Sequence, residues 1–157
     1  MALHPSARRV QDELTRLGIP AQIVELEEST RSAAQAAEAV GCDIGQIAKS
    51  LVFRSALTGK PILVITSGAN RVDEAAFGQR IGDSIERAEP DFVRNATGFA
   101  IGGVPPVGHT SPIEIYFDED LLRHPTIWAA GGTPRALFEV DPRRLLSASR
   151  ATPTRVT

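Results

Sequence analysis

Lys49 is the side chain in this sequence with the clearest capacity for chemistry. The chain of 157 residues contains two lysines against fifteen arginines, so lysine is not its usual surface cation. Lys60 follows Thr58-Gly59 in a predicted turn, where a solvated ammonium group needs no explanation. Lys49, in contrast, comes just before Leu51-Val52-Phe53, an apolar run typical of a buried strand. Its ammonium group must reach solvent along its flexible side chain or face a polar cavity, and the scarcity of lysine favours the cavity.

Two glycine-rich segments offer a second kind of chemistry. They are residues 102–109, with the sequence GGVPPVGH, and residues 130–134, with the sequence AGGTP, and each follows a predicted strand. Successive glycines let backbone N–H groups converge on a developing negative charge, which is how an oxyanion is stabilised. Each segment alone is ordinary turn chemistry, but together with an isolated lysine the two indicate a site. His109 is either part of that site or a plain turn residue.

Other common chemistries lack the residues they need. The single cysteine, Cys42, has no evident base, and the three histidines lack the spacing of metal ligands. Neither a phosphate-binding glycine-lysine motif nor a dinucleotide-binding motif occurs. We therefore predict no metal and no cofactor.

The one cysteine is typical of a reducing cytoplasm, and no apolar run is long enough to cross a membrane. A net charge of −2 argues against bulk electrostatic binding of nucleic acid.

Helices and strands alternate in a pattern that predicts one α/β domain with a mixed, largely antiparallel sheet flanked by helices. Its centre is a hairpin of strands 51–54 and 62–66, preceded by a short helix that begins after Asp43 and ends at Lys49. Ser32 with Gln35 predicts a capping box for a helix over 33–40. Further helices are predicted over 5–17, 72–81, 90–97 and from 142, and further strands over 20–26, 85–88, 99–101, 113–117, 126–130 and 136–140.

The order of these motifs resembles that of a known family. Residues 48–53 (AKSLVF), the strand 62–66, residues 102–108 and the pair Gly131-Gly132 occur in the order seen in the YbaK/EbsC family. This family comprises free-standing aminoacyl-tRNA editing domains related to the insertion domain of bacterial prolyl-tRNA synthetase. The resemblance implies one domain over residues 1–149 with a partly barrel-like sheet, and a flexible tail over 150–157. It implies hydrolysis of the ester between a wrong amino acid and a tRNA, with the acceptor end of the aminoacyl-tRNA and prolyl-tRNA synthetase as partners.

The resemblance also assigns roles to residues. Lys49 matches the family's hallmark lysine, and the two glycine pairs match its pocket loops. Lys49, Gly102 and Gly103 would be catalytic, with the glycine amides on the oxyanion and Lys49 holding the terminal nucleotide or the carbonyl side; a neutral Lys49 acting as a base is less favoured. The expected substrate contacts are Thr30, Ser32, Ser50, Val104, His109, Ala130, Gly131 and Gly132. Thr30 and Ser32 have an alternative role as helix caps.

Two positions depart from the family pattern. Pro105 and Ala130 stand where some members carry serine, which favours alanine or 2-aminobutyrate over cysteine or serine as the amino acid removed, with proline tRNA as the expected carrier. Two other functions remain open at this point. The first is a non-catalytic module of the same fold that binds tRNA or a synthetase, and the second is a hydrolase of small-molecule esters.

Overall fold

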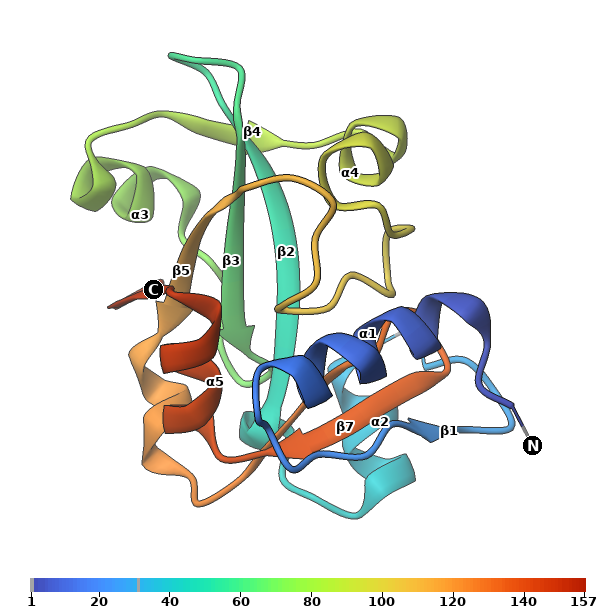
Figure 1. The fold of residues 1–157 in the computed structure, drawn as a ribbon. Helices are drawn as coiled ribbons and strands as arrows, with labels where there is room; N and C mark the ends of the chain where they lie inside the picture. The colour runs from blue at the N-terminus through green and yellow to red at the C-terminus, as the bar shows by residue number, and fades with distance from the viewer. Residues whose placement is uncertain (1, 31) are drawn as a thin grey trace.

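The computed structural model describes residues 2–30 and 32–157, and its centre is a long hairpin of β2 (Ile47–Ser55) and β3 (Pro61–Ser67) (Figure 1). α3 (Glu74–Ile81) and α4 (Pro90–Thr97) lie near the tip of this hairpin, while α1 (Pro5–Arg16), α2 (Ala33–Val40) and α5 (Pro142–Ser149) surround its other end. The remaining elements are β1 (Val24–Glu25), the 3₁₀ helices η1 (Ile44–Gln46) and η2 (Glu119–Arg123), and the strands β4 (Ile85–Arg87), β5 (Glu114–Asp118), β6 (Ile127–Ala130), β7 (Ala136–Val140) and β8 (Thr152–Thr154).

The described strands form one mixed sheet of eight strands. Its order is β1-β7-β6-β2-β3-β5-β8, and β4 pairs with β2 outside this path. The pairs β1–β7, β2–β3, β2–β4 and β6–β7 are antiparallel, while β2–β6, β3–β5 and β5–β8 are parallel. The prediction of a single α/β domain with a mixed sheet is confirmed. The sheet does not close on itself, because β1 and β8 are its two ends.

One edge of β2 is shared by two short strands, and this arrangement leaves a gap. β3 pairs with β2 from Ala48 to Arg54. On the opposite edge, β6 pairs only with Ile47 and Ala48, whereas β4 pairs only with residues 53–55. Residues 49–52 of β2 therefore have a strand neighbour on one side only.

The core lies on both faces of the hairpin. On one face, Val10 and Leu14 of α1 pack with Leu63, Ile65 and other residues of the sheet, and both α1 residues are fully buried. On the other face, Phe53, Ile62 and Val64 pack against Phe77 of α3. Because successive side chains of a strand point to opposite faces, the two clusters divide β2 and β3 between odd and even positions. None of the described helices is long and apolar enough to cross a membrane.

Three local predictions were wrong. Lys49 is the third residue of β2 and not the end of a helix, because η1 ends at Gln46 and Ile47 already has extended dihedral angles. The predicted strand over 99–101 is a turn, since the Gly103 N–H donates to the Ala100 carbonyl oxygen at 3.0 Å and the backbone is satisfied locally. The edge strand predicted over 20–26 is reduced to Val24–Glu25, which alone pair with β7.

The expected flexible tail is instead part of the sheet. Residues 152–154 form β8, which pairs with β5 along its outer edge. Val156 is 1% exposed and packs in the cluster that contains Phe53 and Phe77. The carbonyl oxygen of Val156 also accepts a hydrogen bond of 2.9 Å from the Asp73 N–H at the start of α3. A valine buried against two phenylalanines gives the end of the chain a packed position that its polar composition does not predict.

Candidate active site

A cleft of about 540 Å³ opens where β2 lacks its second neighbour. Residues 47–53 of β2 line it, and the polar pair Lys49 and Ser50 lies in the middle of this run. The cleft brings together seven of the residues predicted from the sequence: Thr30, Ser32, Lys49, Ser50, Gly102, Val104 and Ala130. The other four, Gly103, His109, Gly131 and Gly132, do not line it.

Lys49 and Ser50 serve different faces of the sheet. Leu51, on the face of Lys49, packs in the cluster that includes Val72, and Val52, on the face of Ser50, packs in the cluster that includes Val104. The cleft therefore has a cationic wall on the Lys49 side and an apolar wall on the Ser50 side. Because the cleft lies at the unpaired edge of β2, it is continuous between the two faces of the sheet and borders both walls.

The cationic wall has an excess of positive charge. Lys49 is half-buried, and Arg71 and Arg87 line the same cleft. The one acidic residue on the wall, Glu74, lies 3.6 Å from the Nε atom of Arg87 through its Oε2 atom. Within residues 2–30 and 32–157 no carboxylate lies within ion-pair distance of Lys49. A wall with unpaired cations is suited to a phosphate group or to an oxygen that becomes negative during a reaction.

Two of the four glycine amides predicted to hold the oxyanion are already hydrogen-bonded to backbone carbonyls. The Gly103 N–H is bonded to the Ala100 carbonyl and the Gly131 N–H to the Ala136 carbonyl at 2.7 Å, so neither is free to hold an oxyanion. A Cβ atom on Gly103 would lie 2.7 Å from Cα of Thr133 and 3.0 Å from the carbonyl carbon of Gly132. Gly103 thus lets the two loops pack backbone against backbone, whereas Gly132 makes room for the backbone of Ser6 in α1. Gly102 differs, because it lines the cleft at a turn position with φ of +88°.

His109 braces the first loop from outside the cleft. Its Nε2 atom lies 2.7 Å from the carbonyl oxygen of Pro105, and because that oxygen can only accept, the ring nitrogen donates. Burial lowers the pKa of His109 from its ordinary value of 6.5, against the opposing effects of the Pro105 bond and of Glu13. The ring is therefore neutral at pH 7. Pro105 itself is buried and does not line the cleft.

The two hydroxyl residues that precede and begin α2 have structural roles as well as places in the cleft. The Ser32 hydroxyl accepts a bond of 3.1 Å from the Gln35 N–H and so caps the helix. Thr30 donates through its N–H and its hydroxyl to the Pro134 carbonyl, at 3.0 and 3.3 Å. The second glycine loop is thereby tied to the segment that enters α2.

Sequence reasoning missed several residues of the cleft wall. Arg71 comes from the segment before α3, Glu74 from α3 and Arg87 from β4, and no sequence motif marks these positions. Trp128 lines the cleft from β6, next to Ile47 in the sheet. Ile101, 58% exposed, stands at the turn before Gly102. In the sequence, the one tryptophan was a possible signal for Trp128, and the isoleucine next to the first glycine pair was a possible signal for Ile101.

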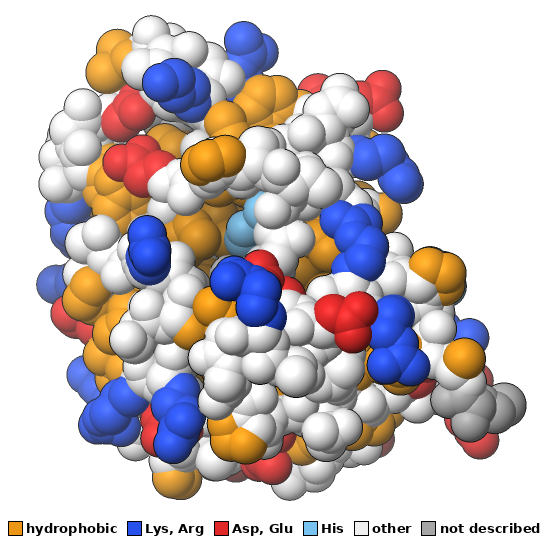
Figure 2. Space-filling view, viewed as in Figure 1, with side chains coloured by type: hydrophobic (Ala, Val, Ile, Leu, Met, Phe, Trp, Pro, Cys, Tyr) orange, Lys and Arg blue, Asp and Glu red, His pale blue; other side chains and the backbone are white. Residues whose placement is uncertain are grey.

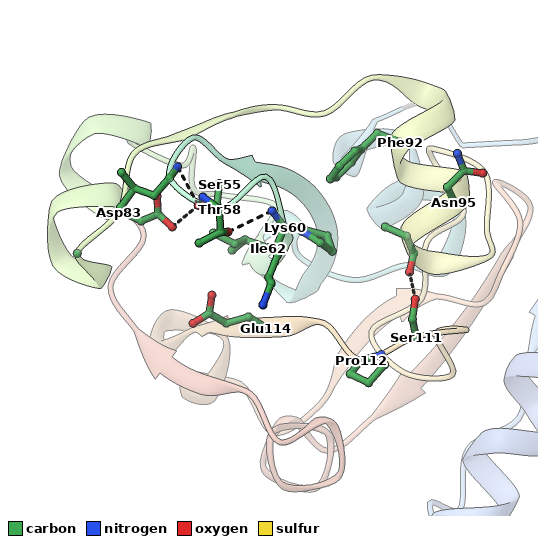
Figure 3. A pocket seen from close by; sticks show the side chains of 14 residues that line it. Ser55, Thr58, Lys60, Ile62, Asp83, Phe92, Asn95, Ser111, Pro112 and Glu114 are labelled. Carbon is green, nitrogen blue, oxygen red and sulfur yellow. Dashed lines mark hydrogen bonds between the residues drawn. The ribbon is translucent and has the colours of Figure 1, made fainter.

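A second and larger cavity, of about 760 Å³, lies between the tip of the β2–β3 hairpin and α4 (Figure 3). Its polar side chains are largely bonded to neighbours: the Ser55 hydroxyl donates to Asp83 at 2.7 Å, and the Ser111 hydroxyl donates to the Ala96 carbonyl at 3.1 Å. Lys60 lines this cavity. Because Lys60 is exposed whereas Lys49 is half-buried, we assign the site to the smaller cleft around Lys49.

The charges of the molecule are dispersed on the face shown in Figure 2, where basic side chains stand among acidic and neutral ones. With a net charge of −2, the chain lacks the strong positive charge of a protein that holds nucleic acid by bulk electrostatics. No group of three or more histidine, cysteine, aspartate or glutamate residues close enough to hold a metal ion occurs in the described part of the chain.

The sequence and the fold both match a known class of domain. The sequence model of the aminoacyl-tRNA editing domain family matches residues 27–148, and the chain belongs to this family. The protein is accordingly a hydrolase of the aminoacyl-tRNA deacylase class.

Three relatives illustrate the likeness. "Uncharacterized protein YwhH" of Bacillus subtilis is 32% identical over 140 residues, which cover 89% of this chain and 88% of that protein. "Putative Cys-tRNA(Pro)/Cys-tRNA(Cys) deacylase EbsC" of Enterococcus faecalis is 26% identical, over 76% of this chain and 73% of that protein. A crystal structure described as "a putative trans-editing enzyme for prolyl tRNA synthetase" superposes with a TM-score of 0.93 at 50% identity, and 99% of each chain is covered.

Proposed function

We propose that this protein is a cytoplasmic trans-editing deacylase that removes a small amino acid, alanine or 2-aminobutyrate in preference to cysteine or serine, from mischarged proline tRNA. The observation that carries the proposal is a half-buried lysine that has no carboxylate partner among the described residues, set in a cleft whose opposite wall is apolar. The likeness to a structure described as a trans-editing enzyme for prolyl tRNA synthetase supports the choice of proline tRNA.

Such an activity is needed because a synthetase can discriminate only weakly between similar amino acids. A synthetase pocket separates side chains that differ by one methylene by only about 1–3 kcal/mol, so smaller amino acids are attached at an appreciable rate. A second site that admits only the smaller side chains then removes them. Prolyl-tRNA synthetase is the partner whose errors this protein would correct.

The residues of the cleft divide the work. Lys49, as an ammonium group, binds the terminal nucleotide or the carbonyl side of the ester, together with the charge of Arg71. Water attacks the ester carbonyl, and the electron pair moves to the carbonyl oxygen. Collapse of this intermediate returns the ribose hydroxyl and releases the free amino acid. Of the glycine amides first considered, those of Gly103 and Gly131 are bonded to backbone carbonyls, and Gly132 does not line the cleft. The Gly102 amide is therefore the remaining candidate for an oxyanion donor.

The apolar wall supports the choice of substrate. Val93 and Val104, which are 1% and 3% exposed, line the cleft with Ala130. Ala130 offers no hydroxyl group to a polar substrate side chain, whereas Pro105, the other departure from the family pattern, lies outside the cleft wall. An apolar wall of this kind favours a methyl or ethyl side chain.

The test is a deacylation panel with a matched lysine control. Alanyl-, 2-aminobutyryl-, seryl- and cysteinyl-tRNA of the proline type are incubated with the wild type, Lys49→Ala and Lys60→Ala. We expect alanine and 2-aminobutyrate to be released fastest and Lys49→Ala to lose about 10²–10³-fold in kcat, the cost of removing one donor to the developing charge. Lys60→Ala, which alters the other cavity, should keep wild-type activity. A folded Lys49→Ala variant with wild-type rates refutes the assignment, and a wild type that releases none of the four amino acids refutes the function.

A further inference from the structure

We propose that the aminoacyl group of the substrate binds as a single strand residue in the gap of the sheet, opposite Ser50, through the backbone N–H and C=O groups of that residue. This inference rests on the proposed function. It assigns recognition of the α-amino group and of the ester carbonyl to the main chain of β2.

The first step of the argument is the gap itself. The last β6 pair is Ala48 with Ala129, and the first β4 pair is Phe53 with Arg87. Extending the β4 register would place residue 90 opposite Ser50, but α4 begins at Pro90 and takes the chain away. Extending the β6 register would place residue 131 there, but the Gly131 N–H turns to the Ala136 carbonyl of β7. Both neighbours thus stop short of Ser50.

The second step is the direction of the backbone groups. The Ile47 carbonyl accepts from the Gly68 N–H at 2.7 Å, and the Ser55 N–H donates to the Lys60 carbonyl at 2.9 Å, so odd positions of β2 bond towards β3. In an antiparallel ladder the alternate residues point their N–H and C=O groups the other way. Ala56 agrees, because its N–H donates to Ser84 on the β4 side at 2.7 Å. Both backbone groups of Ser50 therefore face the gap.

The third step is the fit of the ligand. An aminoacyl ester carries an ammonium donor and a carbonyl acceptor on neighbouring carbons, which is the N–Cα–C=O unit of a strand residue. Placed antiparallel opposite Ser50, its ammonium group donates to the Ser50 carbonyl and its ester carbonyl accepts from the Ser50 N–H. Paired residues share a face, so an L side chain enters the apolar wall with Val104 and Val93, whereas a D side chain is directed to the Lys49 wall.

The side chain of Ser50 agrees with an occupied position. Its Oγ atom is buried and has no hydrogen-bond partner among the described residues. An unsatisfied buried hydroxyl group is uncommon in folded proteins, and a ligand is one of the ways in which such groups find a partner. Serine is also small, which leaves room beside it for the substrate side chain. The ribose then leaves the gap on the side of Lys49 and Arg71, where the cations are.

Amide hydrogen exchange tests this docking without a mutation. The probe is 3′-deoxy-3′-(L-alanylamino)adenosine, in which an amide replaces the ester so that no turnover occurs. In the free protein the Ser50 amide should exchange quickly and the Leu51 amide, bonded to β3, slowly. The probe should slow exchange at Ser50 by at least tenfold and leave Leu51 unchanged. Equal exchange at Ser50 with and without saturating probe overturns the proposal.

Two variants and two analogues complete the test. Ser50→Pro removes the N–H that faces the gap without removing a β3 bond, and Ser50→Ala keeps that N–H. We expect Ser50→Pro to weaken probe binding at least tenfold more than Ser50→Ala does, because only the proline removes the N–H that holds the ester carbonyl. The wild type should also bind the D-alanyl and the propionyl analogues, the latter without an amino group, at least tenfold more weakly. Equal binding of all three probes refutes the docking mode even if Ser50→Pro does not fold.

The outcomes separate this inference from the function on which it rests. If the wild type deacylates the tRNA panel but binds the propionyl analogue as well as the L-alanyl one, the docking mode is wrong and the function stands. If the wild type releases none of the amino acids, the function is wrong, and protection of the Ser50 amide by the probe then supports the docking mode alone.

Discussion

Replacing Gly103 by alanine tests whether the two glycine loops act by packing against each other. The new Cβ atom would lie 2.7 Å from Cα of Thr133, while ordinary contact begins at 3.4 Å, so one loop must move by about 0.7 Å. The neighbouring atoms belong to backbone and cannot rotate away. Overpacking of this kind costs about 1–3 kcal/mol. For a chain of this size each kcal/mol lowers Tm by roughly 2–4 °C.

The same displacement should reach the cleft, because Gly102 and Val104, the two neighbours of Gly103 in the chain, line the cleft. A misplacement of about 1 Å can cost 10²-fold in rate, so a smaller one should lower kcat/KM on the order of tenfold. Gly18→Ala is the control: its φ of +73° strains an alanine by roughly 1–2 kcal/mol, but nothing lies within 4 Å of the added atom. Both variants should lose stability in thermal unfolding and only Gly103→Ala should lose deacylation. A Gly103→Ala protein with unchanged Tm and kcat/KM, or a Gly18→Ala protein with equal loss of activity, would refute this reasoning.

Three further predictions concern protonation and the end of the chain. Burial lowers the pKa of His109 below 6.5, so the unfolded chain binds the proton more readily and the free energy of unfolding should fall as pH drops below 6.5. In urea unfolding, the difference in this free energy between pH 7.5 and pH 5 should be smaller for His109→Gln than for the wild type. Burial, followed by the bond to Glu114, raises the pKa of Tyr116 from 10.0 to about 12; absorbance at 295 nm should report this directly, since the chain has one tyrosine, and stability should decline between these pH values. Truncation after Arg150 removes β8 and Val156, and should lower the free energy of unfolding by about 2 kcal/mol or more.

Each of these has an outcome that would contradict it. A His109→Gln protein with the same acid sensitivity as the wild type would place the titration elsewhere. A tyrosine absorbance that rises with a midpoint near 10 would show that Tyr116 is not held as a phenol by its surroundings. A truncated protein with the Tm of the full chain would show that β8 contributes nothing to stability.

The sequence predicted elements well where local signals were strong. The hairpin of β2 and β3 followed from two apolar runs around a Thr-Gly-Lys turn, and α2 from its Ser32 cap and the closing Gly41. The sequence was less informative where a distant partner decides the conformation. Lys49 belongs to a strand because β3 lies beside it, and no local pattern distinguishes this from a helix end.

Residues 150–157 were predicted to be loose, but contacts with distant parts of the chain order them. Residues 150–157 are polar apart from two small side chains and one valine, which is typical of a loose end. The free edge of β5 and the space beside Phe77 determine their structure, and both are features of the folded molecule. The arginines of the cleft wall could not be predicted for a similar reason, because Arg71 and Arg87 are brought to Lys49 only by the packing of α3 and β4 on the hairpin.

Among the paired glycines, Gly103 is the one whose missing side chain lets the two loops pack together. The amides of Gly103 and Gly131 are hydrogen-bonded to backbone carbonyls, and that of Gly131 turns to β7. β6 ends at Ala130 and does not reach Ser50. An unpaired strand edge usually invites association with another chain. Here the unpaired stretch spans only residues 49–52 and lines a cleft, so we expect it to pair with a ligand the size of one residue and not with a long strand.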